Sequence, residues 1–154
     1  VENKKDIYYT ICGNGPDEAE LRKLIHEKKL EKQVQLIGFR TDMNEILQTA
    51  DVFAFPSIRE GLGIAAIEAL ACGVPLIVAD NRGTREYLHN DKNGLICDAF
   101  DRNAFVAAID KVYSNVEYRK KLADYCRESV IQFSTEETVR TMERIYSTMD
   151  KRIS

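Results

Sequence analysis

Two hydrophobic patterns alternate along the chain as far as residue 97. Five short runs of mostly Ile, Val, Leu, Tyr and Phe are separated by longer segments in which apolar residues recur every three or four positions. The short runs have the length and composition of β-strands that are buried on both faces. They occupy residues 7–12, 34–38, 52–56, 76–79 and 94–97.

The longer segments predict helices over residues 16–30, 42–50, 63–72 and 84–89. In the first of them, one helical face collects the apolar residues Leu21, Leu24, Ile25 and Leu30. Strand followed by helix, four times over, indicates a parallel sheet with helices on both faces. We therefore expect an α/β fold, a doubly wound, Rossmann-like, three-layer α/β/α domain of about five strands over residues 1–154.

Only helical periodicity follows, over residues 102–114, 116–132 and 135–152, which predicts a helical C-terminal part. The last of these helices bears an apolar stripe at i, i+3, i+4 spacing. The stripe consists of Val139, Met142, Ile145, Tyr146 and Met149. Core packing is its simplest interpretation, and a docking face for a second domain is the alternative.

Composition narrows the possible partners. The 22 Lys and Arg and 25 Asp and Glu give a net charge of -3, which provides no broad attraction to nucleic acid. No apolar stretch approaches the ~20 residues that span a bilayer. The four cysteines form no C-x-x-C pair, which fits reduced thiols in the cytoplasm. His26 and His89 lie far apart and outside acidic clusters, so we expect neither a metal nor another cofactor.

Ligands of open parallel sheets bind beyond the carboxyl ends of the strands. The loop over residues 13–18 follows the first strand and opens a helix, so backbone amides at Gly13 and Gly15 could approach a phosphate. Glu18 stands where a dinucleotide fingerprint needs its third Gly, which disfavours NAD. A tight turn without a ligand is the alternative.

The stretch over residues 55–75 is the most informative part of the chain. Gly61 and Gly63 leave the amides of a helix N-terminus uncovered, and a diphosphate would fit there. Glu68 lies in an otherwise apolar helix and should have a polar partner, for which a ribose diol and a buried Arg are both open. Glu60 is either a ligand contact or an ordinary acid at a helix start.

Taken together, the Pro-Ser, Glu-Gly-Leu-Gly and Ile-Glu-Ala-Leu-Ala-Cys-Gly-Val-Pro segments of this stretch resemble the signature of glycosyltransferase family 4. The resemblance extends through the loop at Gly13, the strand at 34–39, Gly83 with Glu86, and residues 93–96, and so covers essentially the whole chain. It implies the C-terminal, donor-binding domain of a retaining enzyme with the two-domain GT-B architecture. Such an enzyme transfers a sugar from a nucleoside diphosphate sugar to an acceptor hydroxyl.

The resemblance also implies a role for each matching residue. Glu60 would lie beside the donor sugar as the catalytic-site carboxylate, without acting as a nucleophile, and Glu68 would hold the nucleotide ribose. Backbone amides for the sugar and diphosphate would come from Gly61, Leu62 and Gly63. The same cleft would be lined by Gly13 and Gly15, with Phe39 and Arg40 near the base.

Part of the family pattern has no match here. Such domains begin with a strand and helix bearing an Arg and a Lys that neutralise the diphosphate, and Arg59, Arg82 and Arg85 do not match them and are expected to be solvated surface charges. We expect this strand and helix, and the N-terminal acceptor domain, to be missing, which would leave the isolated chain inactive. Peripheral membrane association of the full enzyme is left open. So are two other functions: a non-catalytic nucleotide-sugar-binding fragment, and a GT-B epimerase or phosphorylase.

The missing strand would occupy the middle of a sheet ordered 3-2-1-4-5-6, between the strands at 7–12 and 52–56. Because backbone groups cannot stay unpaired in a core, three outcomes follow. The two strands pair directly, another chain supplies a strand, or the sequence omits residues of a longer polypeptide. We expect the third, since direct pairing would shift the loop at Gly13 by roughly one strand spacing, ~4.8 Å.

Overall fold

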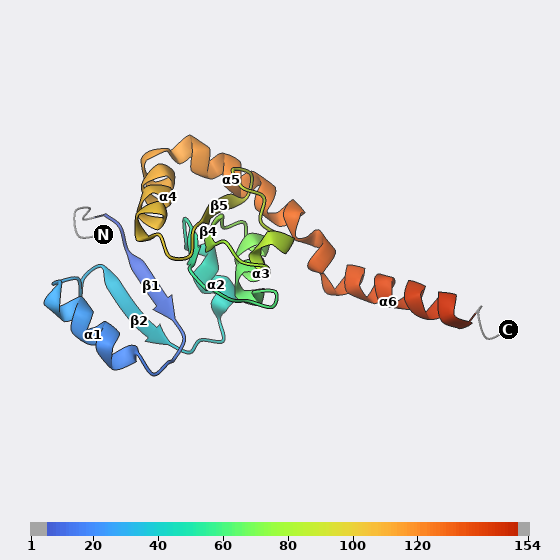
Figure 1. Ribbon diagram of the computed structural model, residues 1–154, viewed down its shortest axis with the longest axis horizontal. Coiled ribbons are helices and arrows are strands. Elements are labelled where there is room, and N and C mark those ends of the chain that lie inside the picture. The colour runs from blue at the N-terminus through green and yellow to red at the C-terminus, as the bar shows by residue number, and fades with distance from the viewer. Residues whose placement is uncertain (1–5, 151–154) are drawn as a thin grey trace. The chain divides into compact units, whose positions relative to one another are not determined.

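The computed structural model describes residues 6–150, with side chains through residue 148. They belong to two compact units, unit 1 within Val1–Met43 and unit 2 within Asn44–Ser154. The described strands form two parallel sheets, one in each unit. Each unit is built from strands joined by helices, which confirms the expected parallel α/β architecture (Figure 1).

Unit 1 is a single βαβ element. Strands β1 (Tyr9–Cys12) and β2 (Val34–Gly38) pair in parallel, and α1 (Glu18–Glu27) connects them and packs on β2. Figure 1 shows the two strands side by side with α1 along them. The register shifts by one residue at the end of the pair, so that Cys12 lies opposite Gly38. This shift sets the geometry of the loop that follows β1.

The strands of unit 1 are much more exposed than the sequence predicted. Val34, at 9% exposure, is the one hydrophobic residue of described unit 1 that is buried, whereas Tyr9 and Leu24 are 41% and 46% exposed. The expectation that these two strands are buried on both faces is therefore wrong. The reason is that a two-stranded sheet with one helix has only one layer to pack against within its own unit.

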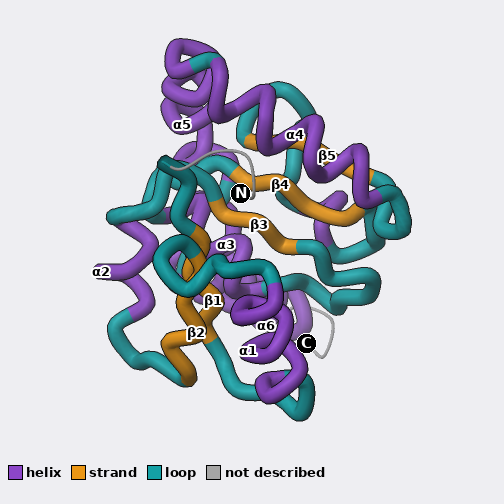
Figure 2. Tube along the Cα trace, turned by 90° about the vertical axis from the view of Figure 1, so that its left-hand side faces the viewer, coloured by secondary structure: helices purple, strands orange, loops and turns teal. Residues whose placement is uncertain are grey.

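Unit 2 contains strands β3 (Phe53–Phe55), β4 (Leu76–Ala79) and β5 (Gly94–Cys97) in the order β3-β4-β5, all parallel (Figure 2). The central strand β4 has four fully buried residues. The prediction of a strand buried on both faces is thus confirmed for β4. β3 is only half-buried.

Helices pack on both faces of this sheet. α3 (Ile64–Ala71) contacts β3 and β4, whereas α4 (Arg102–Ser114) contacts β4 and β5. α5 (Val116–Ser129) packs on both helices. Alternation along β4 turns Ile77 to the side of α4 and its neighbours to the side of α3. The core on the α4 side consists of Ile77, Leu95, Cys97, Ala108, Val112 and Leu122.

The end of α3 explains the Cys-Gly-Val-Pro segment of the sequence. Gly73 has a positive φ of 84°, and its N–H donates to Leu70 O at 2.9 Å. Val74 N–H donates to Ala69 O at 2.9 Å. These two bonds form a Schellman motif, which needs a residue without Cβ strain at the left-handed position. The motif ends the helix and directs the chain into β4.

The prediction of a helix over residues 84–89 is wrong, because only the short 3₁₀ turn η1 (Thr84–Glu86) forms. The buried amide of Asn93 donates to Tyr87 O at 2.9 Å and accepts from His89 N–H at 2.8 Å. It also donates to Ser129 Oγ at 2.8 Å. These bonds take backbone groups that a continued helix would have used, and they lead the chain into β5.

The other helices have shorter bounds than predicted in the first half of the chain, as α2 (Met43–Gln48) shows. After α5 comes the 3₁₀ turn η2 (Ile131–Phe133), followed by α6 (Thr135–Asp150). The last two residues of the predicted helix, 151 and 152, lie outside the described residues.

The apolar stripe of α6 is not core. Val139, Met142, Ile145 and Tyr146 are 44–61% exposed, and the side chain of Met149 lies outside the described ones. Figure 1 shows α6 extending away from the other helices of unit 2. The prediction of core packing is therefore wrong for the four described positions, because described unit 2 places no second layer on that face.

The single five-stranded sheet of the prediction is divided into sheets of two and three strands. Direct pairing of β1 with β3, the first of the three expected outcomes, is not formed among the described strands. The other two outcomes stay predictions.

Candidate functional site

The loop after β3 places Glu60 on a support of buried polar groups. Ser57 Oγ donates to Glu60 Oε1 at 2.7 Å, and Asn81 Nδ2 donates to Ser57 O at 2.7 Å. Asn81 is buried, and its Oδ1 accepts from Thr84 N–H at 3.1 Å. The carboxylate is thus connected through Ser57 to the loop that follows β4. Such a connection fixes a side chain more firmly than a loop exposed to solvent does.

Gly83 brings the loops after β3 and β4 into close contact. A Cβ at this position would lie 3.0 Å from Glu60 O and 3.1 Å from Gly61 O. Any larger residue would push the loop of Glu60 away from its support. The Gly83 of the sequence motif therefore has a packing reason within unit 2.

The N-terminus of α3 is accessible. Gly63 is its N-cap, with a left-handed φ of 79°, and the amides of Ile64 and Ala65 have no carbonyl four residues earlier in the helix to bond. Leu62 and Ile64 are 36% and 65% exposed. Gly61 has no atom within 4 Å of the position of a Cβ. The positive end of the helix dipole and its amides are thus available to an anion.

Glu68 lies on the exposed face of α3, one turn after Ile64. Its side-chain carboxylate makes no hydrogen bond or ion pair with any residue that the structure describes. The expectation of a buried carboxylate that needs a partner is wrong, because the helix buries only its opposite side. The alternative of a buried Arg partner is wrong for the same reason. An exposed carboxylate without an internal partner is available to a ligand at the start of the helix.

The basic residues near this loop are surface charges, as predicted. Arg59 and Arg82 are exposed, and Arg85 forms an exposed ion pair with Asp80 at 2.7 Å. The Arg85 guanidinium holds the pKa of the Asp80 carboxyl below its usual value.

In unit 1 the loop after β1 is organised by Asn14. Its Oδ1 accepts from Phe39 N–H at 3.1 Å, and Gly13 N–H donates to Gly38 O at 2.8 Å. Gly13 has a φ of 117°, and neither Gly13 nor Gly15 has an atom within 4 Å of the position of a Cβ. Both glycines therefore leave open space around the backbone. The sequence pattern assigns no role to Asn14, although this residue lies between the two glycines.

Phe39 and Arg40 end the same turn. The ring of Phe39 is 74% exposed. Arg40 Nε donates to Asp42 Oδ1 at 2.8 Å, and a second Arg40 nitrogen bonds the other carboxylate oxygen. Hydrogen bonds from Arg40 lower the pKa of Asp42. Phe39 thus offers a flat apolar surface, whereas the charge of Arg40 is partly neutralised by a neighbour that the sequence analysis missed.

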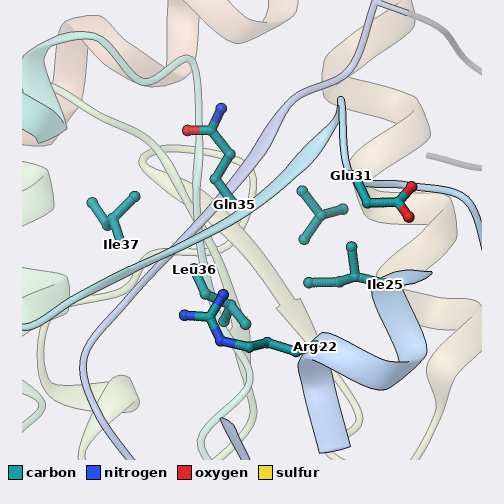
Figure 3. Close-up of a pocket in the computed structure, with 7 residues that line it drawn as sticks. Arg22, Ile25, Glu31, Gln35, Leu36 and Ile37 are labelled. Atoms are coloured by element: carbon teal, nitrogen blue, oxygen red, sulfur yellow. The ribbon is translucent and has the colours of Figure 1, made fainter. Parts of the chain in front are cut away.

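A separate pocket of about 400 Å³ lies between α1 and β2 (Figure 3). It is lined by Arg22, Ile25, Glu31, Val34, Gln35, Leu36 and Ile37. The two charged groups of its lining already bond neighbours, Arg22 to Glu18 at 2.7 Å and Glu31 to His26 at 2.8 Å. None of the predicted site residues lines this pocket.

Residues 6–150 contain neither a candidate membrane-spanning helix nor a candidate metal-binding cluster. No helix there is long and apolar enough to cross a membrane. No group of three or more His, Cys, Asp or Glu side chains in that part of the chain has an arrangement that would hold a metal ion. All four cysteines are free thiols.

The fold resembles that of solved glycosyltransferases. HepE of Anabaena, solved in complex with UDP, aligns with a TM-score of 0.87 at 20% identity over 94% of this chain and 42% of that one. TarM of S. aureus, in a complex that includes UDP, aligns with a TM-score of 0.86 at 24% identity over 95% of this chain and 30% of that one. These likenesses establish a Rossmann-like fold of the kind found in GT-B enzymes.

The sequence comparisons establish the family. Residues 1–129 match the family model described as glycosyl transferases group 1, and the chain belongs to that family. EpsD of Bacillus subtilis (strain 168), assigned as a glycosyltransferase, is 36% identical over 146 residues, which are 95% of this chain and 38% of that protein. LpsE of Rhizobium meliloti (strain 1021), a lipopolysaccharide core biosynthesis glycosyltransferase, is 29% identical over 131 residues, 84% of this chain and 38% of that protein. The chain thus spans 38% of the length of these two relatives.

Proposed function

We propose that this chain is the donor-binding part of a retaining glycosyltransferase that transfers a sugar from a nucleoside diphosphate sugar to an acceptor hydroxyl. The observation that supports it best is the start of α3. An accessible helix N-terminus, a supported carboxylate at Glu60 and an unpartnered, exposed one at Glu68 occur within nine residues of one another. Membership of the glycosyl transferases group 1 family favours sugar transfer over the epimerase and phosphorylase alternatives.

In this proposal the diphosphate binds at the backbone amides of Gly61, Leu62 and Gly63, where α3 begins. Charge that builds on the leaving diphosphate is stabilised there by preorganised N–H groups and by the positive end of the helix dipole. The Glu60 carboxylate accepts hydrogen bonds from sugar hydroxyls, and the Glu68 carboxylate accepts them from the ribose. Two solved neighbours, HepE with UDP-glucose and TarM with UDP, bind ligands of this chemical class.

The loop of unit 1 has a separate role in the proposal. The free space around Gly13 and Gly15 admits a phosphate or sugar oxygen close to the backbone, and the exposed ring of Phe39 is a surface on which a nucleotide base can stack. Arg40, held by Asp42, lies beside that ring in the sequence. The donor is held by carboxylates and amides, so binding is expected to need no divalent metal.

The test is calorimetric titration of the 154-residue chain with UDP, GDP, ADP and pyrophosphate, each with and without a chelator. One nucleoside diphosphate should bind and should raise the melting temperature with increasing concentration. Glu68→Gln should weaken that nucleotide roughly tenfold, the value of a hydrogen bond to a charged group, and leave pyrophosphate unchanged.

Glu128→Gln is the matched control, since Glu128 is an exposed carboxylate on α5 and should affect neither ligand. Equal loss of nucleotide and pyrophosphate in the Glu68 variant would contradict the ribose role. Failure of every nucleotide to bind would contradict the donor site itself. Loss of binding in the chelator would contradict the metal-free mode.

A further inference from the structure

Tyr87 has a buried hydroxyl that the proposed roles do not use. The residue is fully buried, and its Oη has no hydrogen-bond partner among the residues that the structure describes. Buried hydroxyls in native proteins are almost always bonded, because removing one from water without a replacement bond is unfavourable. A tyrosine at a position where Phe would fill the same space therefore needs an explanation.

The ring cannot turn its hydroxyl toward solvent. It packs edge-on against Phe133, with ring centroids 6.3 Å apart and planes at 86°. Its backbone carbonyl is held by Asn93 Nδ2 at 2.9 Å. The position of the hydroxyl is consequently set by the fold of unit 2.

The hydroxyl lies against the start of α3. It is 2.8 Å from the position of a Cβ at Gly63, the N-cap of that helix. Tyr87 also follows, by four residues, the Gly83 that is packed against Glu60 and Gly61. A buried donor without an acceptor thus lies behind the segment to which we assign the donor sugar and diphosphate.

Burial, and then the charge of Glu60, raise the pKa of Tyr87 to about 12. The hydroxyl therefore keeps its proton at any physiological pH and can act only as a neutral donor or acceptor. Glu60 is thus the charged group whose carboxylate contributes to the raised pKa of the Tyr87 hydroxyl.

We propose that Tyr87 is a positioning residue of the donor site, whose hydroxyl donates to the Glu60 carboxylate when a nucleoside diphosphate sugar binds at the start of α3. This inference rests on the proposed function. In the described structure Glu60 Oε1 accepts from Ser57, and Glu60 has no bond to Tyr87. When the sugar binds, the half-buried Glu60 carboxylate turns and gains the Tyr87 hydroxyl as a second donor. This hydrogen bond holds the carboxylate in its bound orientation. Tyr87 acts through Glu60 rather than on the ligand, because its hydroxyl is inaccessible from solvent.

The experiment compares the full chain with Tyr87→Phe, Glu60→Ala and the double variant. UDP-, GDP- and ADP-glucose are titrated first against the unmodified chain, and the tightest binder is then used in all variants beside its parent nucleoside diphosphate. Tyr87→Phe should weaken the sugar nucleotide about tenfold and change the parent diphosphate less than about twofold. It should also raise the melting temperature of the free chain by about 2–5 °C, because a desolvated hydroxyl is removed.

A double-mutant cycle separates action through Glu60 from direct contact. If Tyr87 acts through Glu60, Tyr87→Phe causes no further loss in the Glu60→Ala background. Tyr118→Phe is the matched control. It removes a hydroxyl that does have a partner, Asp91 Oδ1 at 2.5 Å, and should leave binding unchanged without raising the melting temperature.

Equal binding of the sugar nucleotide by the unmodified chain and Tyr87→Phe would overturn the inference, and so would additive losses in the cycle. Equal loss of sugar nucleotide and parent diphosphate would also overturn it, since the role would then lie elsewhere in the site. If the unmodified chain binds no nucleotide at all, the proposed function fails, a result distinct from all of these.

Discussion

The loops that hold the predicted site residues are built in opposite ways in the two units. The loop of Glu60 rests on the buried side chain of Asn81, which Thr84 N–H holds in turn, at the end of a sheet whose central strand is completely buried. The loop of Gly13 has one side-chain hydrogen bond, from Phe39 N–H to an exposed Asn14. Both are glycine-rich loops after a parallel strand, yet only the first is preorganised by a core. Sequence pattern alone places such loops, and burial decides how rigid they are.

The largest expected effect tests where the stability lies. Leu122→Ala removes a fully buried side chain from the core of unit 2 and should lower the free energy of unfolding by about 2–5 kcal/mol. Leu24→Ala, at a position of unit 1 that is 46% exposed, should change it by about 0.5 kcal/mol or less. Urea unfolding monitored by circular dichroism measures both. Similar losses of unfolding free energy for the two variants would contradict this difference between the two units.

The next effect addresses the two loop supports directly. Asn81→Ala removes the partners of Ser57 O and Thr84 N–H in a buried setting and should cost about 2–3 kcal/mol. Asn14→Ala removes the partner of Phe39 N–H, which water can replace, and should cost about 1 kcal/mol or less. Amide hydrogen exchange at Thr84 and Phe39 reports the local consequence. A larger cost for Asn14→Ala would show that the loop of unit 1 is the more rigid one.

The smallest effect concerns a property that the two units share. Asp42 in unit 1 and Asp80 in unit 2 each have a pKa lowered mainly by hydrogen bonds from an Arg. A lowered carboxyl pKa contributes stability above its unfolded value and loses it as the pH falls through the folded one. Asp42→Asn and Asp80→Asn should therefore be slightly less stable than the unmodified chain at pH 7. They should become equal to it once the pH has fallen below the folded-state pKa of these carboxyls.

Thermal unfolding from pH 7 downward measures this difference. Because both pairs are exposed, the two variants should behave alike despite the contrast between their units. A difference that grows as the pH falls would contradict the assigned sign.

The sequence predicted the regular elements well where pattern and core agree. The bounds of β2, β4 and β5 are those expected, because short and mostly apolar runs that start or end at a polar residue, Pro or Gly leave little freedom. The region after β4 failed, since the buried amide of Asn93 bonds Tyr87 O and His89 N–H and so replaces a helix by a turn. Helical periodicity does not predict a hydrogen bond from a side chain to the backbone of another segment.

The candidate site shows the same limit. Glu60, Glu68 and the glycines were found from their motif, but the supports at Asn81 and Asn14 depend on hydrogen bonds between residues that lie 24 and 25 positions apart. The burial of Glu68 was mispredicted because an apolar helix composition does not say which side faces the sheet. The exposed stripe of α6 was mispredicted for a different reason. Its amphipathic pattern marks an apolar face but does not say whether a second layer is present to cover that face.

The contact between Gly63 and Tyr87 also has an evolutionary consequence. A Cβ at position 63 would lie 2.8 Å from the Tyr87 hydroxyl, so Gly63 cannot be exchanged while Tyr87 keeps that hydroxyl. Along a mutational path, alanine at 63 requires that position 87 first lose its hydroxyl, and even then Phe55 Cε1 at 3.0 Å and the left-handed φ of 79° keep a cost. Among descendants of this sequence, Tyr at 87 should therefore be found only beside Gly at 63, whereas Gly at 63 is compatible with either Tyr or Phe at 87.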